Sequence, residues 1–237
     1  MRLLLTRPRA DSDDLAKELS QRGIESLINP LLDIELEPEK LPRADDWQAV
    51  LVTSRNGARA LAKSSLVKST PIIAVGDATA EALVHVGFMA VKSAAGDAND
   101  LLALARTHLN PSAGPVLHVS GDRIALDLAN ALSAGGFECV RAALYRTRET
   151  TAFDPETEAA LRQHAVDGVL LFSPRTAELF ATLVIRGELD GTTHRLTAFC
   201  ISEAVAEAAR AVDWKAVYVA KCPDKNALLS LVEAAKS

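Results

Sequence analysis

Arginines recur close to the ends of apolar segments, and small hydroxyl residues accompany them. The sequence reads VLVTSRNG at 50–57 and VLLFSPRT at 169–176, so a serine and then an arginine follow an apolar run in both places. The four arginines placed in this way are Arg7, Arg55, Arg123 and Arg175. Guanidinium groups bind carboxylates, and so do the free N–H groups at the start of a helix. The pattern therefore predicts pockets for anionic groups at these corners.

The same serines also have a purely structural interpretation. Ser54 and Ser173 stand where a helix N-cap is expected, and Pro174 follows at the favoured first helical position. Further candidate caps are Asp77, Ser120 and Asp122. Helix capping is the simpler explanation at any one corner, whereas the repeated placement of arginines favours anion binding. The residues alone leave both interpretations open.

Side chains that could transfer a proton are few. Tyr145 lies in ALYRTRE, a segment expected to connect two halves of the chain, where its phenol could reach a cleft and act as an acid. Tyr218 lies in the apolar run AVYVA, which predicts a core position. The five histidines show no metal-ligand spacing, so no metal site is expected. His118 differs from the others because it lies inside a predicted strand, PVLHVSG, near a candidate corner.

Composition and missing motifs exclude several classes of function. The formal net charge is −5 and aromatic residues make up 4%, which argues against a nucleic-acid partner. The glycine fingerprint of dinucleotide-binding proteins, the P-loop, HExxH and GxSxG are all absent from the sequence, and no cofactor is expected. The apolar stretch in MRLLLTRPRADSDD is too short for a signal peptide and is followed at once by acidic residues, and no run approaches a membrane span. Cys139, Cys200 and Cys222 are expected to be buried thiols in a reducing cytosol, so the predicted location is cytoplasmic, without a membrane partner.

The sequence contains an internal repeat, and each half is predicted to consist of three successive strand–helix units. LAKELSQRG from Leu15 recurs as LANALSAGG from Leu128, and AVGDATAEA from Ala74 has a weaker copy in CISEAVAEA from Cys200. Apolar runs at 3–5, 50–52, 72–75 and 169–172 predict buried parallel strands. This alternation predicts an α/β fold of two similar lobes, each a parallel sheet flanked by helices.

Two segments without a following helix predict how the lobes are joined. ESLINPLLDIELEP and ECVRAALYRTRET each follow the first strand–helix unit of a half. They predict a two-stranded connector near 29–37 and 140–149. The first domain is then discontinuous, built from 1–34 with 150–237, and the second comprises 38–146.

The ordered set of motifs resembles the uroporphyrinogen-III synthase family. The matching pieces are LLTRP, VLVTSRNGARAL, AVGDATAEALVHVGF, VLHVSGDR, LANALSAGGFECVRAALYRT, VLLFSPRTAELF and VAKCPDKNALLSLV, and they span nearly the whole chain. AVGDATA and LYRT are the most specific among them. The resemblance implies a cofactor-independent cyclising lyase of heme and tetrapyrrole biosynthesis, with hydroxymethylbilane as its small-molecule substrate. The reaction removes the ring A hydroxyl as water, and ring D attacks and is inverted before closure to uroporphyrinogen III.

The resemblance also implies roles for individual residues. Tyr145 matches a tyrosine proposed to assist departure of the hydroxyl, and Thr79 matches a threonine at the cleft. The remaining expected substrate-binding residues are Thr6, Arg7, Ser54, Arg55, Gly76, Ser120, Arg123, Ser173, Arg175 and Ser202. Backbone N–H groups at these corners are expected to hold the carboxylates. The protein is expected to be a monomer.

One corner departs from the family pattern. Ser202 stands in place of a glycine and Val205 in place of a threonine, which reduces the room for backbone to approach a ligand. Three other interpretations compete with the enzyme. These are a non-catalytic two-lobed binder of a polyanionic small molecule, a nucleotide-linked reductase or transferase, and a structural or regulatory fragment.

Overall fold

Two compact units make up the chain. The computed structural model describes residues 1–43, 46–124 and 126–236. One unit combines residues 1–33 with the chain from Arg148 onward, and the other is the continuous segment Ile34–Thr147. The chain passes from one unit to the other within two strands, β3 (Leu32–Leu36) and β8 (Cys139–Glu149).

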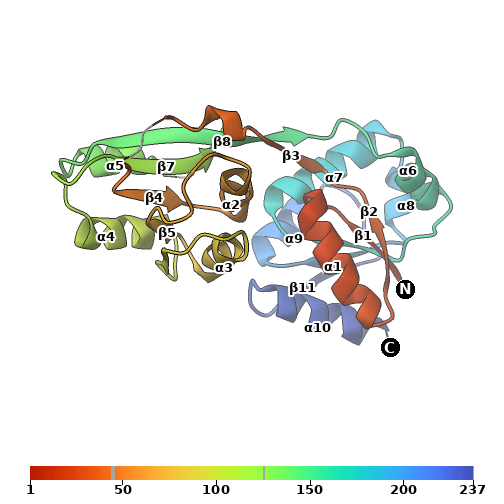
Figure 1. Ribbon diagram of the computed structural model, residues 1–237. Helices are drawn as coiled ribbons and strands as arrows, with labels where there is room; N and C mark the ends of the chain where they lie inside the picture. The colour runs from red at the N-terminus through yellow and green to blue at the C-terminus, as the bar shows by residue number, and fades with distance from the viewer. Residues whose placement is uncertain (44–45, 125, 237) are drawn as a thin grey trace. The chain divides into compact units, whose positions relative to one another are not determined.

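The discontinuous unit is built on a five-stranded parallel sheet in the order β11-β10-β9-β1-β2. Its strands are β1 (Arg2–Leu5), β2 (Glu25–Ile28), β9 (Gly168–Leu171), β10 (Thr197–Cys200) and β11 (Ala216–Val219). Its helices are α1 (Arg9–Gln21), α6 (Pro155–Arg162), α7 (Pro174–Arg186), α8 (Asp190–Thr193), α9 (Glu203–Ala209) and α10 (Lys225–Lys236). Helices α7 and α9 lie on one face of the sheet, and α1 and α10 lie on the other (Figure 1). Apolar side chains of each pair form a separate core cluster with the sheet.

The continuous unit has a six-stranded sheet in the order β3-β8-β7-β4-β5-β6. Besides β3 and β8, its strands are β4 (Ala49–Val52), β5 (Ile72–Ala74), β6 (Val91–Ser93) and β7 (Val116–Gly121). Its helices are α2 (Arg55–Ala62), α3 (Asp77–His85), α4 (Ala98–His108) and α5 (Leu128–Ser133), with a 3-10 turn at Pro38–Lys40. Helices α2 and α3 cover one face, and α4 and α5 cover the other.

The internal repeat of the sequence corresponds to a repeated sheet order. Apart from β3, the six-stranded sheet has the order β8-β7-β4-β5-β6, and the five-stranded sheet, taken from its other edge, has the order β2-β1-β9-β10-β11. Matched position by position, the two orders pair β4, β5 and β6 with β9, β10 and β11, and β7 and β8 with β1 and β2. In the discontinuous unit the last two of these strands come from the start of the chain. The parallel sheets flanked by helices, predicted from the apolar runs, are confirmed.

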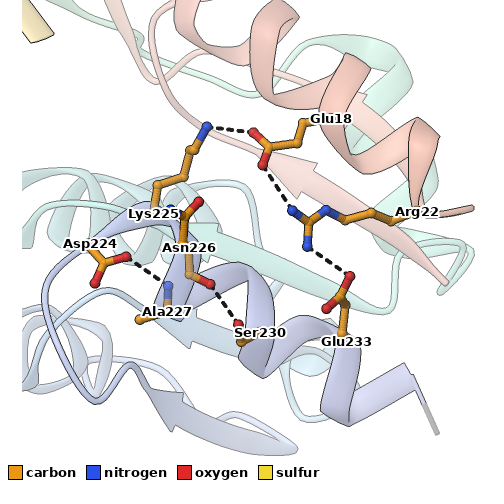
Figure 2. A network of polar contacts seen from close by, with 8 residues as sticks. All are labelled: Glu18, Arg22, Asp224, Lys225, Asn226, Ala227, Ser230 and Glu233. Atoms are coloured by element: carbon orange, nitrogen blue, oxygen red, sulfur yellow. Dashed lines mark hydrogen bonds and ion pairs between the residues drawn. The ribbon is translucent and has the colours of Figure 1, made fainter.

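An ion-pair network joins the first and last helices of the chain inside one unit (Figure 2). Lys225 Nζ lies 2.6 Å from a carboxylate oxygen of Glu18, and Arg22 contacts both Glu18 at 3.1 Å and Glu233 at 2.8 Å. The hydrogen bond from Lys225 holds the pKa of Glu18 below its usual range. These partly exposed pairs add little free energy individually, but they fix α10 beside α1.

Several local expectations are wrong. ESLINPLLDIELEP is two strands, because β2 ends at Ile28 and β3 starts at Leu32. Tyr218 is 44% exposed on β11, an edge strand that pairs on one side only within the described part of the chain. Of the three cysteines, Cys200 is buried, Cys139 is half-buried and Cys222 is exposed. Among the described residues, no helix combines the length and apolar character needed to cross a membrane.

Candidate functional site

Ser54, just beyond the carboxyl end of β4, meets Tyr145 of β8 across the end of β7, the strand that lies between them in the continuous unit. Ser54 follows β4 and caps α2, accepting a hydrogen bond from the backbone N–H of Gly57 at 3.1 Å. The Ser54 and Tyr145 hydroxyls are 2.8 Å apart. The expected N-cap is therefore confirmed, and the same serine also orients the phenol. A tyrosine held in this way can donate its proton to a group that approaches from outside the sheet.

Gly121 makes room for the Tyr145 ring. It ends β7 at the point where the pairing with β8 becomes irregular. A Cβ atom placed on Gly121 would lie 2.6 Å from Cε2 and 2.8 Å from Cζ of Tyr145. The tyrosine can keep its present position only because residue 121 lacks a side chain.

We therefore expect Gly121→Ala to displace the tyrosine. The added methyl group forces the ring away, which breaks the hydrogen bond to Ser54 and misplaces the phenol. Overpacking of this kind costs about 1–3 kcal/mol of unfolding free energy. Urea denaturation should record that loss, and tyrosine NMR signals should shift. Unchanged Tyr145 signals would contradict the assigned packing.

A cavity of about 360 Å³ lies beside Tyr145 within the same unit. Its walls are formed by Thr53, Val75, Asp97, Ala98, His118, Gly121, Arg123, Ile124, Leu126 and Tyr145. Most of these residues lie at or just beyond the carboxyl ends of β4, β5 and β7. This edge is where open parallel sheets bind their ligands.

Ser120 is a candidate helix cap by sequence, but it caps no helix in the described part of the structure. It is buried in β7, donates to the carbonyl of Gly121 at 3.0 Å and accepts from Arg141 Nε at 2.9 Å. The following helix, α5, begins only at Leu128 and is capped by Asp127 instead. Both hydrogen bonds of the Ser120 hydroxyl are therefore made to residues of β7 and β8, within the sheet.

The corner between β5 and α3 is open. Gly76 occupies the N-cap position with extended backbone, and no side chain of the described residues caps the start of α3. Asp77, a predicted cap, is instead the first residue of the helix. Thr79 is 6% exposed, so its side chain is buried in the first turn of α3. The described geometry at this corner leaves the dipole of α3 available to an anion.

Arg55 and Arg123 complete the predicted residues of the continuous unit. Arg55 is the first residue of α2, directly after the Ser54 cap. Arg123 follows β7, is exposed and lines the cavity beside Tyr145. The structure thus brings four residues together near the carboxyl ends of β4 and β7: Ser54, Gly121, Arg123 and Tyr145.

The other predicted residues lie in the discontinuous unit, at the ends of the adjacent strands β1, β9 and β10. Thr6 is buried and donates to the carbonyl of Leu170 at 3.0 Å. Arg7 forms an ion pair with Asp11 at 2.9 Å, and its guanidinium lies 4.4 Å from the centre of the Phe172 ring. These contacts hold both side chains against their own sheet.

The remaining three predicted residues of this unit lie at two corners and differ in their contacts. Ser173 caps α7 as predicted, accepting from the backbone N–H of Thr176 at 3.2 Å. Arg175 forms an ion pair with Glu149, with N–O distances of 2.9 and 3.0 Å, so its charge is already partly compensated. Ser202 occupies the N-cap position of α9, but within the described residues its side chain makes no cap bond.

Asp97 and Ala98, at the start of α4, were not among the predicted site residues, although both line the cavity. Asp97 accepts from the backbone N–H groups of Asn99 and Asp100, and the Asp100 carboxylate accepts from the Asp97 N–H. This reciprocal arrangement is a capping box. The sequence GDAND, with aspartates three residues apart, is the signal that identifies it.

The fold and the strand-end cavity define a two-unit parallel α/β protein whose candidate ligand-binding edge carries a tyrosine and arginines. A family model described as "Uroporphyrinogen-III synthase HemD" matches residues 13–230. The chain therefore belongs to the uroporphyrinogen-III synthase family. It is 26% identical, over 98% of its length, to the "Porphyrin biosynthesis protein HemD" of Ruminiclostridium josui. The chain spans about half of that relative, 48% of its length.

Solved structures share the fold. Uroporphyrinogen-III synthetase from Helicobacter pylori superposes with a TM-score of 0.64 at 18% identity, covering 99% of this chain and 100% of that one. A mutant uroporphyrinogen III synthase from the extremely thermophilic bacterium Thermus thermophilus gives a TM-score of 0.50 at 21% identity, covering 100% of this chain and 97% of that one. At these identities, the likeness concerns the fold alone.

Proposed function

We propose that this chain is a cofactor-independent lyase that cyclises hydroxymethylbilane to uroporphyrinogen III with inversion of ring D. The observation that carries the proposal is the Tyr145 hydroxyl, held 2.8 Å from Ser54 beside a cavity at the carboxyl ends of β4, β5 and β7. Family membership supports the same substrate class. The competing interpretation, a non-catalytic binder of a polyanionic small molecule, has no use for an oriented phenol.

Proton transfer is the contribution that we assign to Tyr145. Its O–H donates to the departing hydroxyl of ring A, which leaves as water, and Ser54 supports the phenol by its hydrogen bond. Ring D then attacks the carbon that has lost the hydroxyl through its own substituted α-carbon, which gives a spiro-pyrrolenine. The bond from that α-carbon to the bridge carbon of ring C breaks, and the bridge carbon bonds to the other α-carbon of ring D, which leaves ring D inverted. The proton lost from this second α-carbon when the pyrrole becomes aromatic again balances the one taken from Tyr145.

Substrate binding is assigned to the strand ends of both units. In the continuous unit these are the corners of Ser54, Arg55, Gly76, Thr79, Ser120 and Arg123. In the discontinuous unit they are the corners of Thr6, Arg7, Ser173, Arg175 and Ser202. Backbone N–H groups at helix starts are the main donors to substrate carboxylates in this proposal, since they bind anions whatever side chain is present. The two units serve as the two domains, 1–34 with 150–237 and 38–146, joined through strands near 29–37 and 140–149.

The isomer of the product tests the proposal directly. Freshly generated hydroxymethylbilane is incubated with the protein, the products are oxidised, and uroporphyrins I and III are separated by chromatography. We expect isomer III in proportion to added protein, because spontaneous closure proceeds without inversion. Heat-denatured protein is the control. Isomer I alone, at the spontaneous rate, would leave the non-catalytic binder as the better interpretation.

Replacing one exposed arginine should have little effect on binding. If backbone donors dominate, Arg123→Ala raises KM no more than about threefold, because an exposed charge contributes about 0–1 kcal/mol. Steady-state kinetics at low and moderate salt provide the measurement. Complete loss of saturation in the variant would show instead that the guanidinium itself holds the substrate.

A further inference from the structure

His118 is a buried imidazole for which the structure provides no hydrogen-bond partner among the described residues. It lies in β7, between Leu51 of β4 and Arg141 of β8, and is 1% exposed. Neither Nδ1 nor Nε2 has a partner within that part of the chain. Burial, followed by the charge of Arg141, lowers the pKa of His118 to about 4, while Asp127 acts in the opposite direction. The ring is therefore neutral near pH 7, with one N–H donor and one acceptor nitrogen.

A buried imidazole without a hydrogen bond lowers the free energy of unfolding of a protein. Buried polar groups are nearly always hydrogen-bonded, and an exception requires a physical reason. Val116, two residues away on the same face of the strand, packs in the apolar cluster under α4 and α5, so an apolar side chain would suit position 118 on packing grounds. Stability alone does not account for a histidine here.

The cavity beside His118 provides the missing explanation. His118 is part of its wall, together with Tyr145 and Arg123. Ile124 and Leu126 supply apolar surface in the same cavity. Such a lining, apolar with a few convergent polar groups, is typical of a ligand site.

Charges around the ring favour an anionic ligand group. The Arg141 guanidinium, on the neighbouring strand β8, is held by the carbonyls of Gly121 and Asp122 at 2.7 and 3.0 Å, and its charge acts on the ring more strongly than the opposing charge of Asp127. Asp97 also lines the cavity, but its carboxylate accepts from two N–H groups at the start of α4, which compensates its negative charge.

We propose that His118 is a substrate-binding residue and that the cavity beside it receives one carboxylate-bearing arm of the tetrapyrrole. This inference rests on the proposed function. The imidazole N–H donates to the carboxylate of that arm. The methylene groups of the arm lie against the apolar walls formed by Ile124 and Leu126. An acetate or propionate arm has this combination of a short apolar stem and an anionic head.

The first test compares His118→Leu with His118→Gln. Leucine is close in volume to histidine but offers no hydrogen bond, so we expect it to raise KM about tenfold, the equivalent of about 1.4 kcal/mol, while Tm stays the same or rises. Glutamine keeps an N–H donor and should recover part of the loss in KM. The control is His194→Leu at an exposed position in the other unit, which should leave KM unchanged. An unchanged KM in His118→Leu would overturn the inference and make His118 a structural residue or the partner of a bound water.

The second test observes the ring itself. Imidazole ¹⁵N signals of the wild type are recorded without oxygen, before and after addition of uroporphyrinogen III, and His118→Leu identifies the signal of residue 118. We expect that signal to move on binding, with the four other histidines as internal references. If the wild type forms isomer III and binds the product while the His118 signal stays fixed, this inference fails and the proposed function stands. If the wild type forms no isomer III, the proposed function is wrong, and so is the inference that the cavity binds an arm of the tetrapyrrole.

Discussion

Tyr145→Phe is expected to lower kcat on the order of a hundredfold, because a positioned proton donor contributes about 10²–10⁴ in rate. The change removes one oxygen atom and its hydrogen bond to Ser54, while the ring continues to fill the space above Gly121. Product affinity should change much less than kcat, since the phenol acts on the departing hydroxyl, whereas backbone N–H groups and His118 are proposed to bind the carboxylates. Steady-state kinetics and product titration measure the two effects separately.

Tyr218→Phe is the matched control, because the chain contains two tyrosines and the second lies on the exposed edge strand β11. It should leave kcat and KM unchanged. Tyr145→Phe with unchanged kcat would remove the phenol from the mechanism. A parallel fall in Tm of many degrees would instead indicate a structural role, since the net contribution of one hydrogen bond is about 1 kcal/mol.

The stability of the protein should fall as pH is lowered from 7 toward 4, and His118 should account for a measurable part of that fall. The unfolded chain protonates this imidazole near pH 6.5, whereas burial and Arg141 lower its pKa in the folded state to about 4. The unfolded state therefore binds more protons between these values, so the stabilisation is complete above the unfolded pKa and is lost as pH falls to the folded one. At about 1.4 kcal/mol per pH unit, the loss approaches about 3 kcal/mol.

Comparison with His118→Leu isolates this contribution from all other titrating groups. Urea denaturation at a series of pH values gives the free energy of unfolding of both proteins. The difference between variant and wild type should widen in favour of leucine as pH falls from about 6.5 to about 4. A difference that stays constant over this range would mean that His118 titrates alike in the folded and unfolded states.

The strands and helices were predictable because the signals that define them are local. Continuous apolar runs such as Val50–Val52 predict strands buried on both faces. The spacing of Leu15 and Leu19 predicts the helix α1, and Gly23 predicts its end. The caps at Ser54 and Ser173 follow from the same local chemistry. The break between β2 and β3 was missed because it depends on partners far along the chain: Asn29 and Leu31 bond to the carbonyls of Leu5 and Thr6.

The candidate site was predictable only in part, since contacts between distant residues decide its geometry. The pattern predicted Tyr145 and Ser54 as separate candidates, but their hydrogen bond depends on the irregular pairing at Gly121. The sequence predicted Arg175 as a ligand-binding residue, whereas in the structure it forms an ion pair with Glu149. His118 stood out in the sequence, whereas its lack of partners among the described residues depends on the packing of β4, β7 and β8.

The interior place of β1, between β9 and β2, has a consequence for the order in which the protein can fold on the ribosome. Leu3 pairs with Gly168 of β9, so β1 leaves the exit tunnel long before this neighbour, which follows only after the whole continuous unit. The continuous unit, Ile34–Thr147, has by then emerged with the strands β4 to β7 and most of β8. Synthesis from the N-terminus lets such a unit fold first. Until β9 appears, the apolar edge of β1 remains unpaired, and the nascent chain must protect this edge from association with other chains.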